Sequence, residues 1–273
     1  MGRVTTKRRI ESIDPDRRTD RFDTLAVEEP LEIRVDGAAL AVTMRTPGSD
    51  FELAQGFLLT EGIVQNRDQI VGIRYCAGAV DGENTYNVLD VSVREPAVAA
   101  LEAARRNQYT TSSCGVCGKA SLDAVVTTTS HDPSGDLVVF TSAMVVSLPR
   151  RLRTAQKVFD STGGLHAAGL FDADGRTLVV REDVGRHNAV DKVIGWALEQ
   201  DKVPLRGIAL CVSGRVSFEL AQKATMAGIP MMVAVSAPSS LAVDLAERGG
   251  VTVAAFVRGD SMNVYSHPHR IAD

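Results

Sequence analysis

The chain has 273 residues, of which 44% are apolar and 23% are charged, a balance typical of a soluble globular protein. Its 30 Lys and Arg residues against 34 Asp and Glu residues give a formal net charge of −4, which argues against a general nucleic-acid binder. No apolar run approaches the ~18 residues of a membrane span, so we expect neither nucleic acid nor a membrane as a partner.

The first 24 residues mix Arg and Lys with Asp and Glu, and this composition predicts a disordered basic tail. The pair Arg8-Arg9 resembles part of a twin-arginine export signal, but no apolar stretch follows it, so we expect no targeting signal and a cytoplasmic location. Thiols are reduced in the cytoplasm, where a close cysteine pair is more often catalytic or metal-binding than a structural disulfide.

Residues 25–138 are predicted to form a small α+β domain. The dipeptide Asp36-Gly37 lies between two apolar runs and predicts a hairpin over Leu31–Met44, because glycine tolerates the positive φ of a tight turn. Ser49 and Glu52 have the spacing of a capping box, which predicts a helix over residues 50–61. The domain continues with strands at 70–75 and 86–93, a helix at 96–106, and a Ser/Thr/Gly-rich loop that holds two cysteines.

Residues 139–273 are predicted to form a second domain, in which helix and strand patterns alternate. A helix at residues 148–161 is expected to stop at Gly163-Gly164. Strands are expected at 166–171, 177–181, 207–212, 231–236 and 251–257, and helices at 187–200, 217–227 and 240–248. This alternation predicts an α/β sheet with a parallel portion and helices on both faces, within a chain that is α+β overall.

Cys114 and Cys117 form a CxxC motif flanked by Gly115 and Gly118. A thiol near Lys119 and a helix start has its thiolate favoured, which makes it a nucleophile near neutral pH. The pair is open to four interpretations: a structural zinc site, a thioredoxin-type redox pair, an inert buried pair, or nucleophilic chemistry with persulfide sulfur. The missing second ligand pair and the polar loop favour the last, although the motif alone does not decide.

Three loops combine Arg and Gly at the expected ends of strands. They are the segments 181–192, 211–220 and 256–261, which bring Arg186 with His187, then Arg215, then the sequence FVRGDS. Helix N-termini and Arg suit anionic ligands, and loops at strand carboxyl ends are where open α/β sheets bind them. We therefore expect a pocket for a phosphate-containing molecule, with His166 near it. The competing interpretations are a salt-bridged strand–helix corner for the first loop and an ordinary turn with a solvated Arg for the second.

Four segments in this order resemble the FdhD family, the sulfurtransferase accessory proteins required for active formate dehydrogenases. The segments are CGVCG at 114–118, EDVGRHNAVDKV at 182–193, SGRVSFELAQKA at 213–224 and FVRGDSMNVYSHP at 256–268. The resemblance spans nearly the whole chain from about residue 25, and the four segments together are highly specific. It implies transfer of sulfur from a cysteine desulfurase to a molybdenum or tungsten bis-pterin guanine dinucleotide, bound as substrate, for the apo-formate dehydrogenase catalytic subunit.

The resemblance also implies roles for particular residues. Cys114 would carry the persulfide and Cys117 would assist it. The loop of Phe256, Val257, Arg258, Gly259, Asp260 and Ser261 would bind the cofactor, and our pocket argument adds Arg186, His187 and Arg215. The resemblance further implies a cytidine-deaminase-like, three-layer αβα fold for residues 139–273, and a homodimer.

Three other functions compete with sulfur transfer. A zinc deaminase would carry His-x-Glu before Pro-Cys-x-x-Cys. Here the Cys pair precedes His166, Ser113 replaces the proline, and Ala168 stands at the glutamate position, so we expect no deaminase activity and no resident metal. A non-catalytic chaperone would use the CxxC to hold zinc, and a dithiol oxidoreductase would cycle it through a disulfide.

Overall fold

The computed structural model describes residues 3–76, 79–80, 83–84, 86–94, 101–102 and 129–273. Cys114, Cys117 and most of the helix predicted at 96–106 lie outside the described residues. Within them, no helix is long and apolar enough to cross a bilayer. The mixed α+β class predicted from the sequence is confirmed by the elements that follow.

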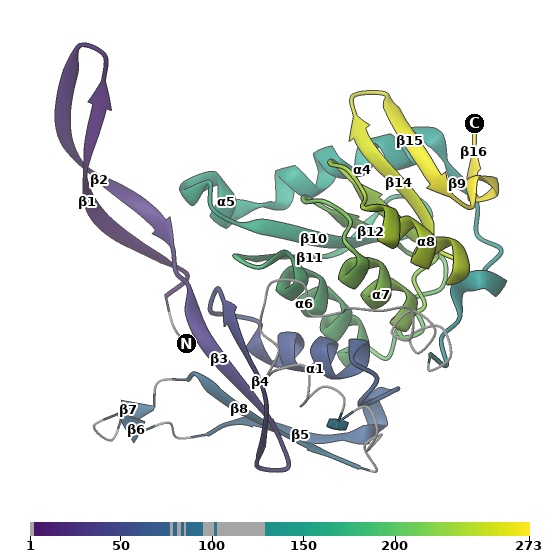
Figure 1. Ribbon diagram of the computed structural model, residues 1–273, viewed down its shortest axis with the longest axis horizontal. Helices are drawn as coiled ribbons and strands as arrows, with labels where there is room; N and C mark the ends of the chain where they lie inside the picture. The colour runs from purple at the N-terminus through teal and green to yellow at the C-terminus, as the bar shows by residue number, and fades with distance from the viewer. Residues whose placement is uncertain (1–2, 77–78, 81–82, 85, 95–100, 103–128) are drawn as a thin grey trace.

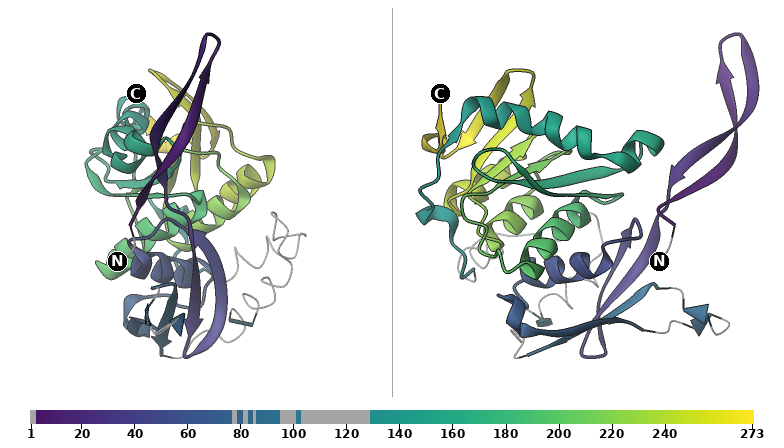
Figure 2. Two further views of the ribbon diagram at one scale, coloured as in Figure 1. Left: turned by 90° about the vertical axis from the view of Figure 1, so that its left-hand side faces the viewer. Right: turned by 180° about the vertical axis from the view of Figure 1, so that it is seen from behind.

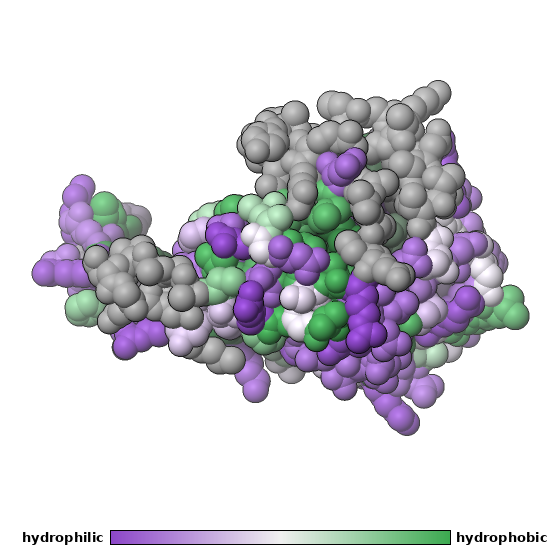
Figure 3. Space-filling view, turned by 90° about the horizontal axis from the view of Figure 1, so that it is seen from below, coloured by the Kyte–Doolittle hydropathy of each residue, from purple (hydrophilic) through white to green (hydrophobic). Residues whose placement is uncertain are grey.

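A four-stranded sheet forms the N-terminal layer, in the order β4-β3-β8-β5. Its strands are β3 (Glu29–Val35), β4 (Ala38–Arg45), β5 (Ile70–Tyr75) and β8 (Val88–Val93). The predicted hairpin is confirmed, with Asp36 and Gly37 both at positive φ (48° and 79°). Helix α1 (Asp50–Thr60) lies between this sheet and the rest of the molecule (Figure 1). Seen from the side of this sheet, polar and apolar groups intermix on the surface (Figure 3).

A six-stranded sheet forms the C-terminal part, in the order β11-β10-β12-β13-β14-β15, and only β12, β13 and β14 run parallel. Its strands are β10 (His166–Phe171), β11 (Thr177–Asp183), β12 (Ala209–Val212), β13 (Met231–Ala234), β14 (Thr252–Arg258) and β15 (Ser261–Ser266). Its helices are α4 (Ser142–Ala155), α5 (Lys157–Thr162), α6 (Arg186–Glu199), α7 (Phe218–Met226) and α8 (Ser240–Arg248). The short elements are β6 (Ala79–Val80), β7 (Glu83–Asn84), β9 (Phe140–Thr141), β16 (Ile271–Ala272) and the 3₁₀ turns Arg67–Gln69, Pro133–Gly135 and Pro268–Arg270.

Side chains alternate between the two faces of this sheet, as a covered sheet requires. On β12, Ala209 and Cys211 face the cluster under α4, whereas Leu210 and Val212 face α6, α7 and α8. The predicted three-layer αβα arrangement of residues 139–273 is therefore confirmed (Figure 1).

Helices α1 and α6 cross at two glycines. A Cβ built on Gly56 would collide with the carbonyl of Asp191, and one built on Gly195 would collide with the carbonyl of Glu52. This close approach lets the apolar sides of both helices join one core that extends from Leu31 of β3 to the six-stranded sheet. The two parts predicted on either side of residue 138 thus share a hydrophobic core.

The N-terminal segment is not the disordered tail that its composition predicts. Strands β1 (Thr5–Asp14) and β2 (Arg17–Ala26) pair along their whole length as an antiparallel hairpin that stands away from the body (Figure 2). We call residues 5–26 the arm. Composition counts charges without their positions. In the hairpin, opposite charges on the two strands lie close enough to pair, as in the diagonal ion pair between Arg9 and Asp20 (2.6 Å).

Helix α1 begins at Asp50 as predicted but is capped differently, and helix α4 begins earlier than predicted. Ser49 adopts a left-handed conformation (φ 54°) and its side chain makes no capping bond, so the predicted capping box is absent. Glu52 instead binds Arg181 through two hydrogen bonds of 2.5 and 2.6 Å. Helix α4 begins six residues before its predicted start, where the Thr141 hydroxyl accepts a bond from the Met144 N–H (3.2 Å).

We predict that Gly195→Ala lowers the free energy of unfolding by about 1–3 kcal/mol or more, because its methyl group would force α1 and α6 apart. Urea unfolding followed by circular dichroism measures the change. The control is Gly72→Ala in β5, where an added Cβ has no neighbour within 4 Å. Equal stability of the two variants would contradict the close crossing.

Candidate functional site

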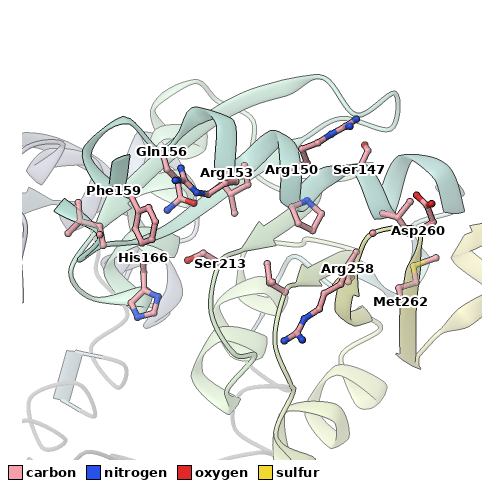
Figure 4. Close-up of a pocket in the computed structure, with 18 of the residues that line it drawn as sticks. Ser147, Arg150, Arg153, Gln156, Phe159, His166, Ser213, Arg258, Asp260 and Met262 are labelled. Atoms are coloured by element: carbon pink, nitrogen blue, oxygen red, sulfur yellow. The ribbon is translucent and has the colours of Figure 1, made fainter. Parts of the chain in front are cut away.

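A cavity of about 1240 Å³ opens at the carboxyl ends of the parallel strands, beneath α4. Ser213 follows β12, Val235 follows β13, and the turn after β14 completes this side of the cavity. The sheet side faces a wall formed by α4, the start of α5 and the loop before β10. Phe159 and His166 lie at one end of the cavity, and Asp260 and Met262 lie at the other (Figure 4).

Two arginines that line this cavity have no carboxylate partner. Within the described part of the chain, Arg150 of α4 and Arg258 at the end of β14 form no ion pair, and both are exposed. Arg153 is held differently: it bonds to Asp160 (2.6 Å) and lies over the Phe159 ring. The unpaired cations make the cavity suited to an anionic ligand.

The predicted loop 256–261 contributes four of its six residues to the cavity lining: Val257, Arg258, Gly259 and Asp260. Phe256 is exposed at positive φ (52°) outside the lining, where the register between β14 and β15 is irregular. The Ser261 hydroxyl closes the turn by donating to the carbonyl of Arg258 (3.1 Å). His166 lines the cavity as expected, whereas Arg186, His187 and Arg215 do not.

The predicted segment 181–192 acts chiefly as a buried corner. Lys192 forms an ion pair with Asp183 (2.7 Å) and donates to the carbonyl of Thr46 (2.9 Å), and all three residues are buried. Asn188 donates to the carbonyl of Met44 (2.8 Å). The competing interpretation, a salt-bridged strand–helix corner, therefore describes these residues, and it ties β4 to α6.

Glu182 connects this corner to the cavity. Its carboxylate accepts the backbone N–H groups of Val158 (2.9 Å) and Phe159 (2.8 Å), which belong to the first turn of α5. A carboxylate at a helix N-terminus is favoured both by these bonds and by the helix dipole. It therefore fixes the end of the cavity at which Phe159 and His166 lie.

Arg186 and His187 form a basic cluster beside His166, next to the cavity. His187 Nε2 lies 3.3 Å from the Ser217 hydroxyl and 3.8 Å from a Glu219 oxygen. Burial, together with Lys223 and Arg186, lowers the pKa of His187 to about 4. Burial and Arg186 also lower the pKa of His166, so both rings are neutral at pH 7.

The other cysteines differ in exposure. Cys211 is fully buried on β12, and burial raises the pKa of its thiol, so it stays protonated. Cys76, at the end of β5, is half-buried. Cys211 therefore has the environment of a packed core thiol.

The α4 side of the cavity was not predicted from the sequence. Ser147, Arg150 and Arg153 recur every three residues and line the cavity with Gln156. This regular spacing of polar and basic residues on one helix face is the sequence signal that could have identified α4 as a wall of the cavity. A solvated helix face has the same pattern, and only the packing of α4 over the strand ends distinguishes the two.

Comparisons with known proteins agree with the motifs. A model of the FdhD/NarQ family matches residues 26–272. A sulfur carrier protein FdhD from Mycolicibacterium paratuberculosis is 63% identical over 269 residues, which cover 98% of this chain and 99% of the relative. One of the same name from Mycobacterium tuberculosis is 57% identical and covers 99% of this chain and 100% of the relative.

A solved structure supports the fold. The crystal structure of a protein from Desulfotalea psychrophila, provisionally described as a formate dehydrogenase accessory protein, superimposes with a TM-score of 0.78 at 26% identity. The match covers 99% of this chain and 100% of that one.

We predict that His187 stays neutral down to about pH 5 in the folded protein. An unfolded histidine titrates near 6.5, so the unfolded state binds the proton first and the free energy of unfolding falls as pH drops from 6.5 to about 4. NMR titration of the histidine ring signals measures both pKa values. Arg186→Ala should raise the pKa of His187 and His166, whereas Arg186→Lys should not; a His187 pKa near 6.5 in the unmodified protein would contradict the cluster.

Proposed function

The chain belongs to the FdhD/NarQ family, and from this membership we propose that it is a sulfur carrier that acts in the maturation of formate dehydrogenase. Its curated relatives carry the name sulfur carrier protein at up to 63% identity over nearly the full chain. The structural relative is described as an accessory protein of formate dehydrogenase. The proposed place of action is the cytoplasm.

The proposed carrier is Cys114, by its match to the CxxC of the family. Its thiolate attacks the terminal sulfur of a persulfide on a cysteine desulfurase. A new S–S bond forms at Cys114, the S–S bond of the donor breaks, and the donor cysteine leaves as a thiolate, so no external oxidant is needed. The acceptor then bonds to the terminal sulfur with its own electron pair, the S–S bond of the Cys114 persulfide breaks, and Cys114 leaves as a thiolate, with Cys117 assisting.

The proposed acceptor is the molybdenum or tungsten bis-pterin guanine dinucleotide, bound as substrate before it enters the apo-formate dehydrogenase catalytic subunit. The observation that carries this proposal is the cavity at the carboxyl ends of the parallel strands, which is lined by Arg150 and Arg258, two arginines without an ion pair among the described residues. Phosphates would bind these cations. A volume of about 1240 Å³ exceeds the usual range for a drug-sized ligand and suits a larger nucleotide.

We predict that incubation with a cysteine desulfurase and cysteine adds the mass of sulfur, about 32 Da per atom, to the protein. Intact-protein mass spectrometry measures the gain, which should disappear on treatment with dithiothreitol and in Cys114→Ala. Cys76→Ala should retain the gain, because the half-buried Cys76 has no proposed role.

The competing functions give different results in the same experiment. Stoichiometric bound zinc without labile sulfur would support the non-catalytic chaperone function in place of the sulfur-carrier function. A reversible disulfide between Cys114 and Cys117, together with reductase turnover, would support the dithiol oxidoreductase function instead. A gain that persists in Cys114→Ala would overturn the assignment of the carrier residue.

We predict that Arg258→Ala weakens the binding of GDP, a probe for the nucleotide half of the substrate, about tenfold or more by removing a charge-assisted contact. Isothermal titration calorimetry measures the affinity. Arg206→Ala is the control, because Arg206 is also exposed but precedes β12, at the opposite edge of the sheet. Equal affinities of the two variants would place the nucleotide elsewhere.

A further inference from the structure

Gln156 lies at the joint between α4 and α5, where its side chain is buried against the cavity. Only 3% of its surface is exposed, and it belongs to the cavity lining. Its backbone is satisfied locally, because its N–H donates to the carbonyl of Arg153 (3.2 Å) and its carbonyl accepts from the N–H of Asp160 (3.2 Å). Its side-chain amide, in contrast, makes no hydrogen bond to the residues that the structure describes.

A buried amide without a protein partner indicates that a bound molecule bonds to it. The amide of Gln156 donates through its NH₂ group and accepts through its oxygen, so a ligand with a carbonyl next to an N–H satisfies both. An anion offers only acceptors and would leave the amide oxygen unpaired. The residue therefore favours a neutral group with a donor beside an acceptor, such as the edge of a cyclic amide.

Phe159 offers a flat apolar surface at the same end of the cavity (Figure 4). Arg153, Gln156 and Phe159 follow one another at intervals of three residues, and all three line the cavity. The guanidinium carbon of Arg153 lies 4.7 Å from the centre of the Phe159 ring. Glu182 accepts the backbone N–H of Phe159 (2.8 Å). These contacts hold the aromatic ring in place, which suits a surface on which another ring stacks.

Space for a ligand remains beside Phe159. Gly163 ends α5 and donates its N–H to the carbonyl of Phe159 (2.7 Å), and Gly163 and Gly164 both line the cavity. A Cβ added to Gly163 would have no neighbour within 4 Å. The chain therefore passes this end of the cavity without a side chain that would fill it.

Charge distinguishes this end of the cavity from the part that suits phosphates. The ion pair with Asp160 (2.6 Å) neutralises Arg153. Burial lowers the pKa of His166, so its ring is neutral at pH 7. The arginines without an ion pair among the described residues, Arg150 and Arg258, lie farther along the cavity (Figure 4). A neutral ring therefore suits this end better than a phosphate does.

We propose that this end of the cavity binds a fused heterocyclic ring of the substrate, which stacks on Phe159 and pairs with the Gln156 amide through a ring carbonyl and the adjacent N–H. The inference rests on the proposed function, because the substrate proposed above carries two kinds of such rings. Guanine and pterin both present a carbonyl beside an N–H on one edge. Arg258 would then bind the phosphates of the same molecule.

Substitution of Gln156 separates ring binding from phosphate binding. Gln156→Leu keeps a side chain of similar size but removes both hydrogen bonds, so the dissociation constant for GDP or for 6-hydroxymethylpterin should rise about tenfold. The dissociation constant for pyrophosphate, which has no ring, should stay unchanged. Isothermal titration calorimetry of the full chain measures all three ligands. Gln200→Leu, at the exposed end of α6, is the matched control and should leave all three affinities unchanged.

Phe159 provides an independent variant. Phe159→Leu should weaken the binding of the ring ligands about tenfold through the loss of stacking, whereas Phe159→Tyr should retain it. Circular dichroism checks the folding of each variant, and unchanged pyrophosphate binding shows that the cavity is intact. A loss confined to GDP would assign this end of the cavity to guanine, and a loss confined to 6-hydroxymethylpterin would assign it to the pterin.

Failure of this inference can be told apart from failure of the proposed function. If the unmodified protein binds GDP or pyrophosphate but Gln156→Leu leaves the affinities for both ring ligands unchanged, the amide bonds only to water, and the inference is wrong while the proposed function stands. An equal loss of pyrophosphate and ring binding would also overturn the inference, because it indicates general damage to the cavity. An unmodified protein that binds none of the three ligands would contradict the proposed acceptor site as well.

Discussion

The structure depends on the contact between α1 and α6. Because Gly56 and Gly195 lack side chains, the two helix backbones touch, and the helix of the N-terminal part packs directly onto the helix that covers the large sheet. Around this crossing, Lys223 of α7 lies 2.9 Å from both Thr60 of α1 and Asp191 of α6. One buried cation thus joins three helices, and its loss would leave a carboxylate unpaired in the core.

The same contact determines the position of the cavity. Helix α6 begins directly after β11, and the buried pair of Asp183 and Lys192 fixes this junction. Glu182, one residue earlier, bonds to the start of α5. The adjacent carboxylates of Asp183 and Glu182 therefore connect the packed core to the end of the cavity where His166 lies. The motif around these residues serves the fold and the candidate site together.

Much of the local structure could be predicted because local physics determines it. Strand β10 and helix α8 have the predicted bounds, and the Asp36-Gly37 turn follows from the backbone freedom of glycine. The arm could not be predicted, because its pairing depends on which charges meet across two strands.

The candidate site was predicted only in part. The turn at Arg258 follows a strand end, which hydrophobic patterning reveals. Arg150 contributes to the cavity through the packing of a helix above distant strand ends, and no sequence window contains that information. In the sequence, the corner at Asp183 resembles an anion-binding site, because Arg, Gly and a helix start occur both in anion sites and in salt-bridged structural corners. The buried ion pair between Lys192 and Asp183 shows that this corner is structural.

The burial of Cys211 gives the protein an internal probe of its own opening. A thiol reagent can reach this side chain only when α4 separates from the sheet, because Cys211 lies on the face that α4 covers. Its alkylation rate in native buffer therefore reports the population of an open form in which the wall of the cavity is displaced. Comparing this rate with and without a bound nucleotide would show whether occupation of the cavity couples to the rigidity of the sheet beneath it.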